Sequence, residues 1–209
     1  MEKRNTTPKK AKPRPLSPQF IKALEYAARA HARQIRKKTE RPYIGHLLGV
    51  TSIVIEYGGD EEMAIAALLH DAVEDQGGLP RLREIRRKFG KRAAHIVDGC
   101  TDAYSEPKPP WLERKRAYLK RISGESDEVR LVSAADKLCN VRETVHDLRV
   151  HGEEVFERFA GKKEGTLWCY RALVEEFRRA SSNPLIEELA RAVSELESLA
   201  GATAMAAKG

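Results

Sequence analysis

The chain has 209 residues, of which 41% are hydrophobic and 33% charged, and its formal net charge at pH 7 is +7. This length suits one domain with a substantial core, and the composition is typical of a soluble helical protein rather than a disordered one. The apolar run from Ala64 to Leu69 is far shorter than the roughly 20 residues of a membrane helix, and no signal-peptide core stands near the N-terminus. We therefore expect a cytoplasmic protein without a membrane partner.

The positive charge is concentrated at the N-terminus. Residues 1–15 contain six Lys or Arg residues against Glu2, a net +5, which leaves only +2 of the total for the rest of the chain. The same segment contains three prolines and cannot bury enough apolar surface to offset its ordering entropy. We expect residues 1–16 to be a disordered basic tail, with a salt-sensitive RNA or acidic-partner contact as the alternative. The near-neutral remainder argues against a nucleic-acid-binding domain.

The predicted elements are helices. Ser17 followed by Pro18 supplies an N-cap and a proline at the first helical position, which predicts a helix from there to about Gln34. Asp60 can cap a helix that continues through His70. The remaining helices are expected near residues 47–57, 80–89, 91–100, 111–123, 127–148, 153–160, 165–181 and 184–200, with loops at 36–42 and 102–110.

No strand is expected. Val129 to Leu131 has strand-forming residues, but the 3.6-residue spacing of the apolar residues that follow favours a helix. The three cysteines form no C-x-x-C pair, which indicates buried apolar residues rather than disulfides or a cysteine-rich zinc site. The predicted fold is all-α, with a single domain at residues 17–200 and a flexible C-terminus at 201–209. The apolar stripe of the last helix leaves open whether it closes the core or forms a homodimer.

Ionisable residues cluster at the end of the apolar run A-A-L-L-H-D-A-V-E-D. His70 and Asp71 are adjacent, so their side chains point about 100° apart on a helix and can still reach one point beyond its surface. Glu74 lies one turn after His70, and Asp75 lies one turn after Asp71. An isolated His-Asp pair is commonly a surface feature or a satisfied core pair. Here the apolar surroundings favour a functional site. In addition, four such groups crowded together would repel one another without a cation.

Two further candidates stand apart in the sequence. Taken alone, His46 is interpreted as a helix-start or core histidine, and Asp136 as part of a surface ion pair with Lys137 or Lys115. Together with the adjacent His-Asp pair they make a set of two imidazoles and two carboxylates. Such a set suits a borderline or hard divalent ion such as Mn²⁺, Fe²⁺ or Zn²⁺, and it leaves positions for water and a substrate oxygen.

The order H … H-D … D resembles the HD phosphohydrolase superfamily. Three segments narrow the resemblance: R-K-K-T-E-R-P-Y-I-G-H (residues 36–46), A-L-L-H-D-A-V-E-D (67–75) and A-D-K-L-C-N-V-R (135–142). Together they resemble the hydrolase domain of RelA/SpoT homologues and, in size, the stand-alone small alarmone hydrolases. The resemblance covers roughly residues 17–180, and it implies an HD-type helical domain.

The resemblance also implies roles for individual residues. The implied metal ligands are His46, His70, Asp71 and Asp136, with manganese as the usual ion. The implied catalytic pair, which orients and activates the attacking water, is Glu74 and Asp75. The residues matched to the nucleotide pocket are Arg36, Lys37 and Asn140. Weaker candidates for substrate contacts are Lys108, Arg114 and Lys115, for which a solvated basic face is the alternative, and Tyr170, for which packing is the alternative.

The implied activity is metal-dependent hydrolysis of the 3′-pyrophosphate of a small nucleotide, (p)ppGpp or (p)ppApp, with release of pyrophosphate. Leu47 and Cys139 depart from the family pattern and leave the base preference open. The alternatives are an HD nucleotidase, a deoxynucleotide triphosphohydrolase, an NADPH 2′-phosphatase and a non-catalytic nucleotide-sensing module. The E-D pair and the R-K loop favour the 3′-pyrophosphate, and the intact ligand set argues against a purely binding role.

Overall fold

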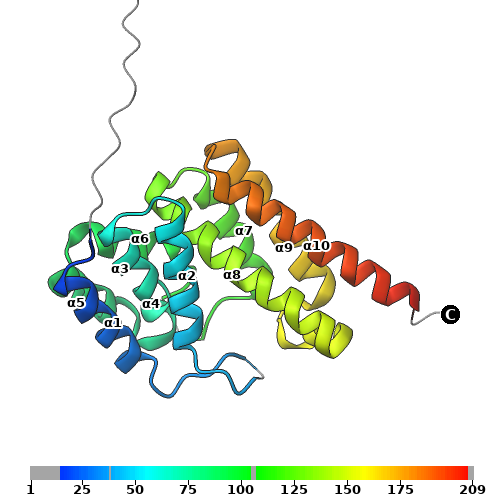
Figure 1. Ribbon diagram of the computed structural model, residues 1–209, viewed down its shortest axis with the longest axis horizontal. Coiled ribbons are helices and arrows are strands. Elements are labelled where there is room, and N and C mark those ends of the chain that lie inside the picture. Colours follow the sequence, from blue (N-terminus) through cyan, green and yellow to red (C-terminus); the bar gives the residue numbers. More distant parts are fainter. Residues whose placement is uncertain (1–14, 38, 105–106, 207–209) are drawn as a thin grey trace, which may run out of the picture.

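The computed structural model describes residues 15–37, 39–104 and 107–206, with side chains described as far as Gly201. Its helices enclose one continuous hydrophobic core (Figure 1). Within these ranges the β-type pairing is limited to an isolated bridge between Ile35 and Pro42, so the predicted all-α fold is confirmed. The helices are α1 (Pro18–Ala30), α2 (Ile44–Glu56), α3 (Glu61–Leu69), α4 (Ala72–Gln76), α5 (Gly78–Phe89), α6 (Lys91–Cys100), α7 (Trp111–Ile122), α8 (Asp127–His151), the 3₁₀ helix η1 (Gly152–Arg158), α9 (Lys162–Ala180) and α10 (Pro184–Ala206).

Side-chain caps start several of these helices where the sequence predicts them. The Ser17 hydroxyl accepts a hydrogen bond from the backbone N–H of Gln19 at 3.1 Å, and Asp60 accepts one from Met63 at 3.1 Å. Each bond satisfies a backbone donor that has no partner within its own helix. The positions of α1 and α3 are therefore encoded locally.

The helix predicted to continue through His70 is divided in two. α3 ends at Leu69 and α4 begins at Ala72, so His70 and Asp71 form the turn between them. Asp71 occupies the N-cap position of α4, but its side chain makes no capping bond there. It is instead bonded by the hydroxyl of Tyr43, at 2.5 Å. The turn lets both side chains project to the same side of the chain.

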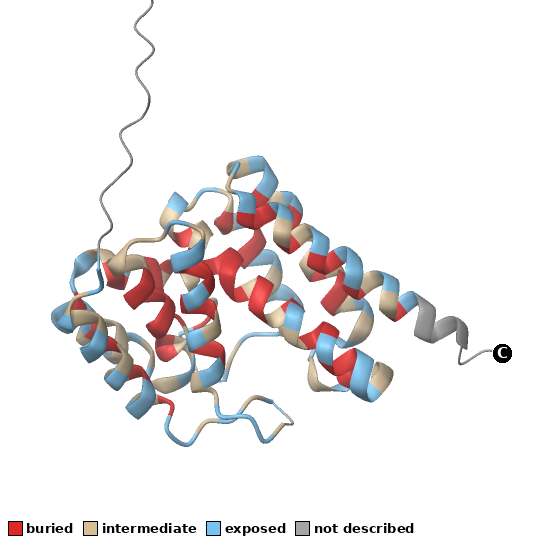
Figure 2. Ribbon diagram, viewed as in Figure 1, coloured by how far each residue is buried: buried red, intermediate tan, exposed pale blue. Residues whose placement is uncertain are grey.

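The long helix α8 lies at the centre of the fold. It packs against α2, α3, α6 and α10, and Figure 2 shows the buried segments concentrated where these helices face one another. A Cβ atom at Gly99 would lie 2.6 Å from Cγ2 of Val129, so glycine allows α6 to approach α8 closely. The apolar stripe of α10 faces the core, because Leu185, Leu189 and Leu196 are fully buried.

Several helix boundaries and one helix type differ from the predictions. α1 ends at Ala30 rather than near Gln34, and in the turn that follows the His31 ring bonds the Gln34 side chain at 2.7 Å. A 3₁₀ helix replaces the α-helix expected near 153–160, and α10 continues to Ala206 rather than ending near 200. Residues 1–14 of the predicted tail lie outside the described residues. No described helix combines the length and apolar character needed to cross a membrane.

Candidate active site

A cavity of about 350 Å³ opens between α2, α4, α7, α8, α9 and the loop at residues 31–43. Charged side chains of both signs line it, which suits a polar, charged ligand. Its acidic residues are Asp71, Glu74, Asp75, Asp102, Asp136, Glu143 and Asp147, and its basic residues are Arg36, Lys37, Arg41, Lys108, Arg114, Lys115, Lys137 and Arg158.

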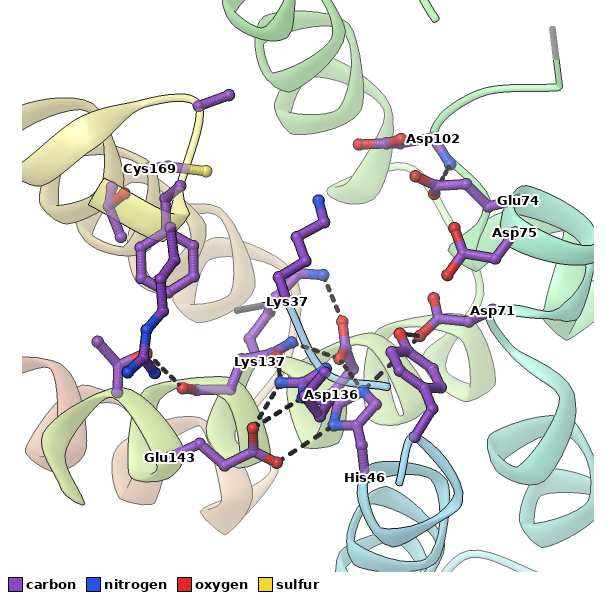
Figure 3. Close-up of a pocket in the computed structure, with 18 of the residues that line it drawn as sticks. Lys37, His46, Asp71, Glu74, Asp75, Asp102, Asp136, Lys137, Glu143 and Cys169 are labelled. Carbon is purple, nitrogen blue, oxygen red and sulfur yellow. Dashed lines mark hydrogen bonds and ion pairs between the residues drawn. The ribbon is translucent and has the colours of Figure 1, made fainter. Parts of the chain in front are cut away.

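The four predicted metal ligands meet beside this cavity. His46 stands in the first turn of α2, His70 and Asp71 at the turn between α3 and α4, and Asp136 in the first half of α8. His46 Nε2 lies 3.1 Å from Asp136 Oδ1, and His70 Nε2 lies 3.0 Å from Asp71 Oδ2. The crossed distances are 3.7 Å from His46 Nε2 to Asp71 Oδ2 and 3.6 Å from His70 Nε2 to Asp136 Oδ1. Each imidazole therefore faces both carboxylates, and Figure 3 shows Asp71 and Asp136 near the His46 ring.

Neighbouring groups fix the orientation of these side chains. His70 Nδ1 lies 2.8 Å from the carbonyl oxygen of Ala67. A carbonyl can only accept, so Nδ1 carries a proton, and Nε2 is the ring nitrogen that faces the centre, where a metal ion would take its lone pair. On the other side, the Tyr43 hydroxyl donates to Asp71 Oδ2 at 2.5 Å. The first contact leaves His70 Nε2 facing the centre, and the second holds Asp71 by Oδ2, the same oxygen that faces the two imidazoles.

The imidazole nitrogens and carboxylate oxygens of this cluster favour the binding of a cation. The Nε2 atoms of His46 and His70 are buried and have no hydrogen-bond partner. Burial alone lowers the pKa of His70, but the facing carboxylates of Asp71 and Asp136 outweigh it and raise the pKa to about 10. The donor atoms of His46, His70 and Asp136 lie within 4.8 Å of one another. A set of imidazole nitrogens and carboxylate oxygens at this spacing fits a divalent metal ion.

Glu74 and Asp75 lie on α4, on the cavity wall next to this cluster (Figure 3). Lys108 Nζ donates to Glu74 Oε1 at 2.9 Å and lies 3.4 Å from Asp75 Oδ1, while Gln34 Nε2 donates to Asp75 Oδ2 at 2.8 Å. Burial, and next the charge of nearby Asp102, raises the pKa of Glu74 above its ordinary value. A carboxylate of raised pKa beside a candidate metal centre is suited to accept a proton near neutral pH.

The family model described as the HD domain matches residues 23–166, which span all four candidate ligands. This match covers well over half of the chain. The chain belongs to the HD-domain family. The predicted HD-type fold and the resemblance to HD phosphohydrolases are both confirmed.

Relatives of this HD domain include proteins named as hydrolases. The chain is 40% identical over 127 residues to the guanosine-3′,5′-bis(diphosphate) 3′-pyrophosphohydrolase MESH1 of Xenopus tropicalis, a match that covers 59% of this chain and 68% of the relative. Human MESH1 is 39% identical over 128 residues, covering 60% and 69%. The solved structure of a metazoan orthologue of SpoT that hydrolyses ppGpp superposes with a TM-score of 0.71 at 28% identity. That superposition covers 88% of this chain and 98% of the other.

Within this HD domain, the residues predicted to contact the nucleotide line the same cavity. Arg36 Nη2 donates to Asn140 Oδ1 at 2.6 Å, and the guanidinium lies 5.4 Å from the centre of the Tyr43 ring. Lys37 extends over the cavity in Figure 3. Tyr170 also lines it, and burial raises the pKa of its hydroxyl. The structure thus gathers these residues around the candidate metal centre, while their contacts with a ligand stay predictions.

The three weaker basic candidates belong to the cavity wall of the HD domain rather than to a separate solvated face. Lys108 pairs with Glu74, as described above, and both other cations pair with Asp102: Arg114 Nη1 at 2.6 Å and Lys115 Nζ at 2.5 Å. Burial alone raises the pKa of the Asp102 carboxyl, but these two cations outweigh it and lower the pKa to about 2.

Sequence reasoning missed three carboxylates that line the cavity, Asp102, Glu143 and Asp147. Asp102 lies in the loop after α6, where no periodic pattern marks it. Glu143 follows Asp136 by seven residues, which is two turns of α8, so helical spacing places both on one face. That spacing was the available signal for Glu143. Lys137, considered in the sequence only as an ion-pair partner for Asp136, does lie 2.5 Å from Asp136 Oδ2 and also lines the cavity.

Proposed function

We propose that this chain hydrolyses the 3′-pyrophosphate of alarmone nucleotides, with His46, His70, Asp71 and Asp136 holding one divalent ion. The observation that carries the proposal is the convergence of these ligands beside Glu74 and Asp75 in one cavity. The chain's HD relatives named MESH1 are 3′-pyrophosphohydrolases of guanosine-3′,5′-bis(diphosphate), and they support the same substrate class.

The ion we propose is Mn²⁺, with Fe²⁺ or Zn²⁺ as alternatives, because mixed nitrogen and oxygen donors suit all three. When bound, such an ion acts as a Lewis acid and lowers the pKa of water from 15.7 toward about 7. The protein contributes the orientation of the ligands, through Ala67 O on His70 and the Tyr43 hydroxyl on Asp71.

Glu74 is the proposed general base, and Asp75 helps to orient the attacking water. Lys108 holds the Glu74 carboxylate by a 2.9 Å hydrogen bond, and burial keeps the pKa of Glu74 raised. Water attacks the phosphorus bonded to the 3′ oxygen and loses a proton to Glu74. The bond between that phosphorus and the 3′ oxygen breaks, and the oxygen takes up a proton. The products are pyrophosphate and a nucleotide with a free 3′-hydroxyl.

Cations that line the cavity offset the charge of the phosphates. Lys137 stands beside Asp136, and Arg36 and Lys37 lie on the loop that borders the same cavity. Most of catalysis at phosphorus comes from positioning and from neutralising charge, so these side chains are suited to that task. Guanine and adenine nucleotides, (p)ppGpp and (p)ppApp, both fit this account, because it places no contact on the base.

The decisive experiment incubates the purified protein and Mn²⁺ with ppGpp, pppGpp, ppApp, dGTP, NADPH and cyclic nucleotides, with Asp71→Ala as the control. Products are separated by ion-exchange chromatography. We expect pyrophosphate from the 3′-pyrophosphate nucleotides and none from the variant. Turnover of only dGTP or NADPH would show that the proposed substrate is wrong, while the proposed metal centre would still stand. Metal binding without any turnover would favour the nucleotide-sensing role instead.

A further inference from the structure

The second ring nitrogen of His46 faces a carboxylate. The His46 side chain is 1% exposed, and its Nε2 atom points at Asp136 and Asp71. On the opposite edge of the ring, Nδ1 is buried without a hydrogen-bond partner and lies 3.8 Å from Glu143 Oε1 (Figure 3). A carboxylate placed behind a ligating imidazole fixes its tautomer and raises its basicity. Glu143 is in position to do this after a small approach of the two groups.

Arg36 determines which oxygen of Glu143 faces the ring. Its Nε and Nη2 atoms donate to the same carboxylate oxygen, Oε2, at 2.9 and 2.6 Å. Oε1 is left toward His46 and toward the thiol of Cys139, whose sulfur is 3.8 Å away. Asn140 and the Tyr43 ring contact the same guanidinium, so Arg36 is itself held.

Helix packing brings the two residues together. Glu143 and the predicted ligand Asp136 are two turns apart on one face of α8, while His46 comes from α2. Gly49 follows His46 by about one turn, and a Cβ atom there would lie 3.0 Å from the Cys139 sulfur. The glycine therefore permits the close contact of α2 with α8 that sets the imidazole against the carboxylate.

We propose that Glu143 is a positioning residue that accepts a hydrogen bond from the Nδ1–H of His46, so that Nε2 presents its lone pair to the metal. Arg36 aims this carboxylate, and the loop that carries Arg36 is thereby coupled to the metal centre. The inference rests on the proposed function only for the presence of a metal at His46. The role is distinct from substrate binding, and it can be measured without any nucleotide.

The test compares Glu143→Gln and Glu143→Ala with Asp147→Asn. Asp147 is the matched control, because it lies one turn further along α8 and is also paired with an arginine of the same loop, Arg41. Titration calorimetry with Mn²⁺ alone measures affinity. We expect roughly 10- to 100-fold weaker binding for both Glu143 variants, the usual effect of removing such a partner, and an unchanged value for the control. Thermal unfolding checks that all variants are folded.

Nitrogen NMR of His46 supplies a readout that a merely structural residue would not change. With diamagnetic Zn²⁺ bound through Nε2, we expect the Nδ1–H signal of His46 in the wild type to show a hydrogen bond to a carboxylate, and in Glu143→Ala to lose that shift. Arg36→Lys should weaken Mn²⁺ binding in the wild type and add nothing in the Glu143→Ala background.

Two results would overturn the proposal in different ways. Wild-type Mn²⁺ affinity and an unchanged Nδ1–H signal in Glu143→Ala would remove the positioning role and leave the proposed hydrolase intact. No Mn²⁺ binding by the wild-type protein would overturn the metal centre and the positioning role together.

Discussion

Two charged clusters on one face of α8 differ in whether the polar groups around their carboxylates have hydrogen-bond partners. Around Asp147, Arg41 Nη2 donates to both carboxylate oxygens, at 2.5 and 2.6 Å, and Arg158 donates to one of them. We call this group the Asp147 cluster. Around Asp136, by contrast, two imidazoles present buried nitrogens that have no hydrogen-bond partner. The first cluster is complete within the protein, whereas the second has converging donors that suit a cation.

This difference separates two kinds of acidic residue in a polar cavity, those that join segments of the chain and those that are candidate metal ligands. A buried carboxylate that arginines already satisfy ties segments of the chain together, as Asp147 ties the 31–43 loop and η1 to α8. A buried carboxylate that shares its space with unpaired imidazole nitrogens is a candidate ligand. Removing an acid should therefore affect metal-dependent chemistry in one cluster and folding stability in the other.

The largest effect is expected for Asp71→Ala. The change removes one of the four donors, so we expect loss of Mn²⁺ binding and a fall in hydrolysis of at least about 10³-fold, since a metal supplies several kcal/mol to such reactions. Mn²⁺ at 100 times its Kd should stabilise the wild type by about 2.7 kcal/mol, and it should leave the variant unchanged. Thermal unfolding with and without Mn²⁺ measures this. A metal-dependent shift that persists in the variant would contradict the assignment of Asp71.

Glu74→Gln should separate chemistry from metal binding. Because Gln cannot accept the proton, we expect kcat to fall roughly 10²- to 10⁴-fold, the usual contribution of a general base. Mn²⁺ affinity should stay close to the wild-type value, because Glu74 is not one of the converging donors. Steady-state kinetics and calorimetry on the same preparation test both halves. Full turnover in the variant would end the role of Glu74 as base.

Asp147→Asn should lower the stability of the fold without changing metal binding, and its effect should be smaller than those of the two variants above. We expect a loss of about 2 kcal/mol in the free energy of unfolding at pH 7, below the 3–5 kcal/mol of a fully buried pair because Arg41 is 46% exposed. Mn²⁺ affinity should not change. Chemical denaturation of both proteins measures the difference, and equal stability at pH 7 would show that the Asp147 cluster contributes nothing.

The same pair of proteins tests the pH dependence of the Asp147 cluster. Burial raises the pKa of the Asp147 carboxyl, but hydrogen bonds from Arg41 and Arg158 outweigh it and lower the pKa below its ordinary value of 3.8. A pKa lowered by folding gives stability that is present above the unfolded value and is lost as the pH falls through the folded one. The stability difference between wild type and Asp147→Asn should therefore shrink as the pH falls below about 4.

The sequence predicted the candidate ligands better than their surroundings. His46, His70, Asp71 and Asp136 stand in short motifs with distinctive neighbours, so each could be named before any fold was known. The turn at His70 and Asp71 was not predicted, because no glycine or proline separates the apolar residues before it from those after it. Local propensity favours a continuous helix there.

Sequence alone determined the helical class, the starts of several helices and the residue types of the candidate centre. Caps and apolar periodicity act over a few residues, so a single sequence contains them in readable form. Tertiary structure decided that Glu143 lies behind His46 and that Asp102 gathers two cations of the cavity wall. These contacts join segments far apart in the chain, and they depend on which helix faces pack together. The hydrophobic effect that drives this packing has no direction of its own, so the close fit at glycines such as Gly49 and Gly99 sets the final geometry.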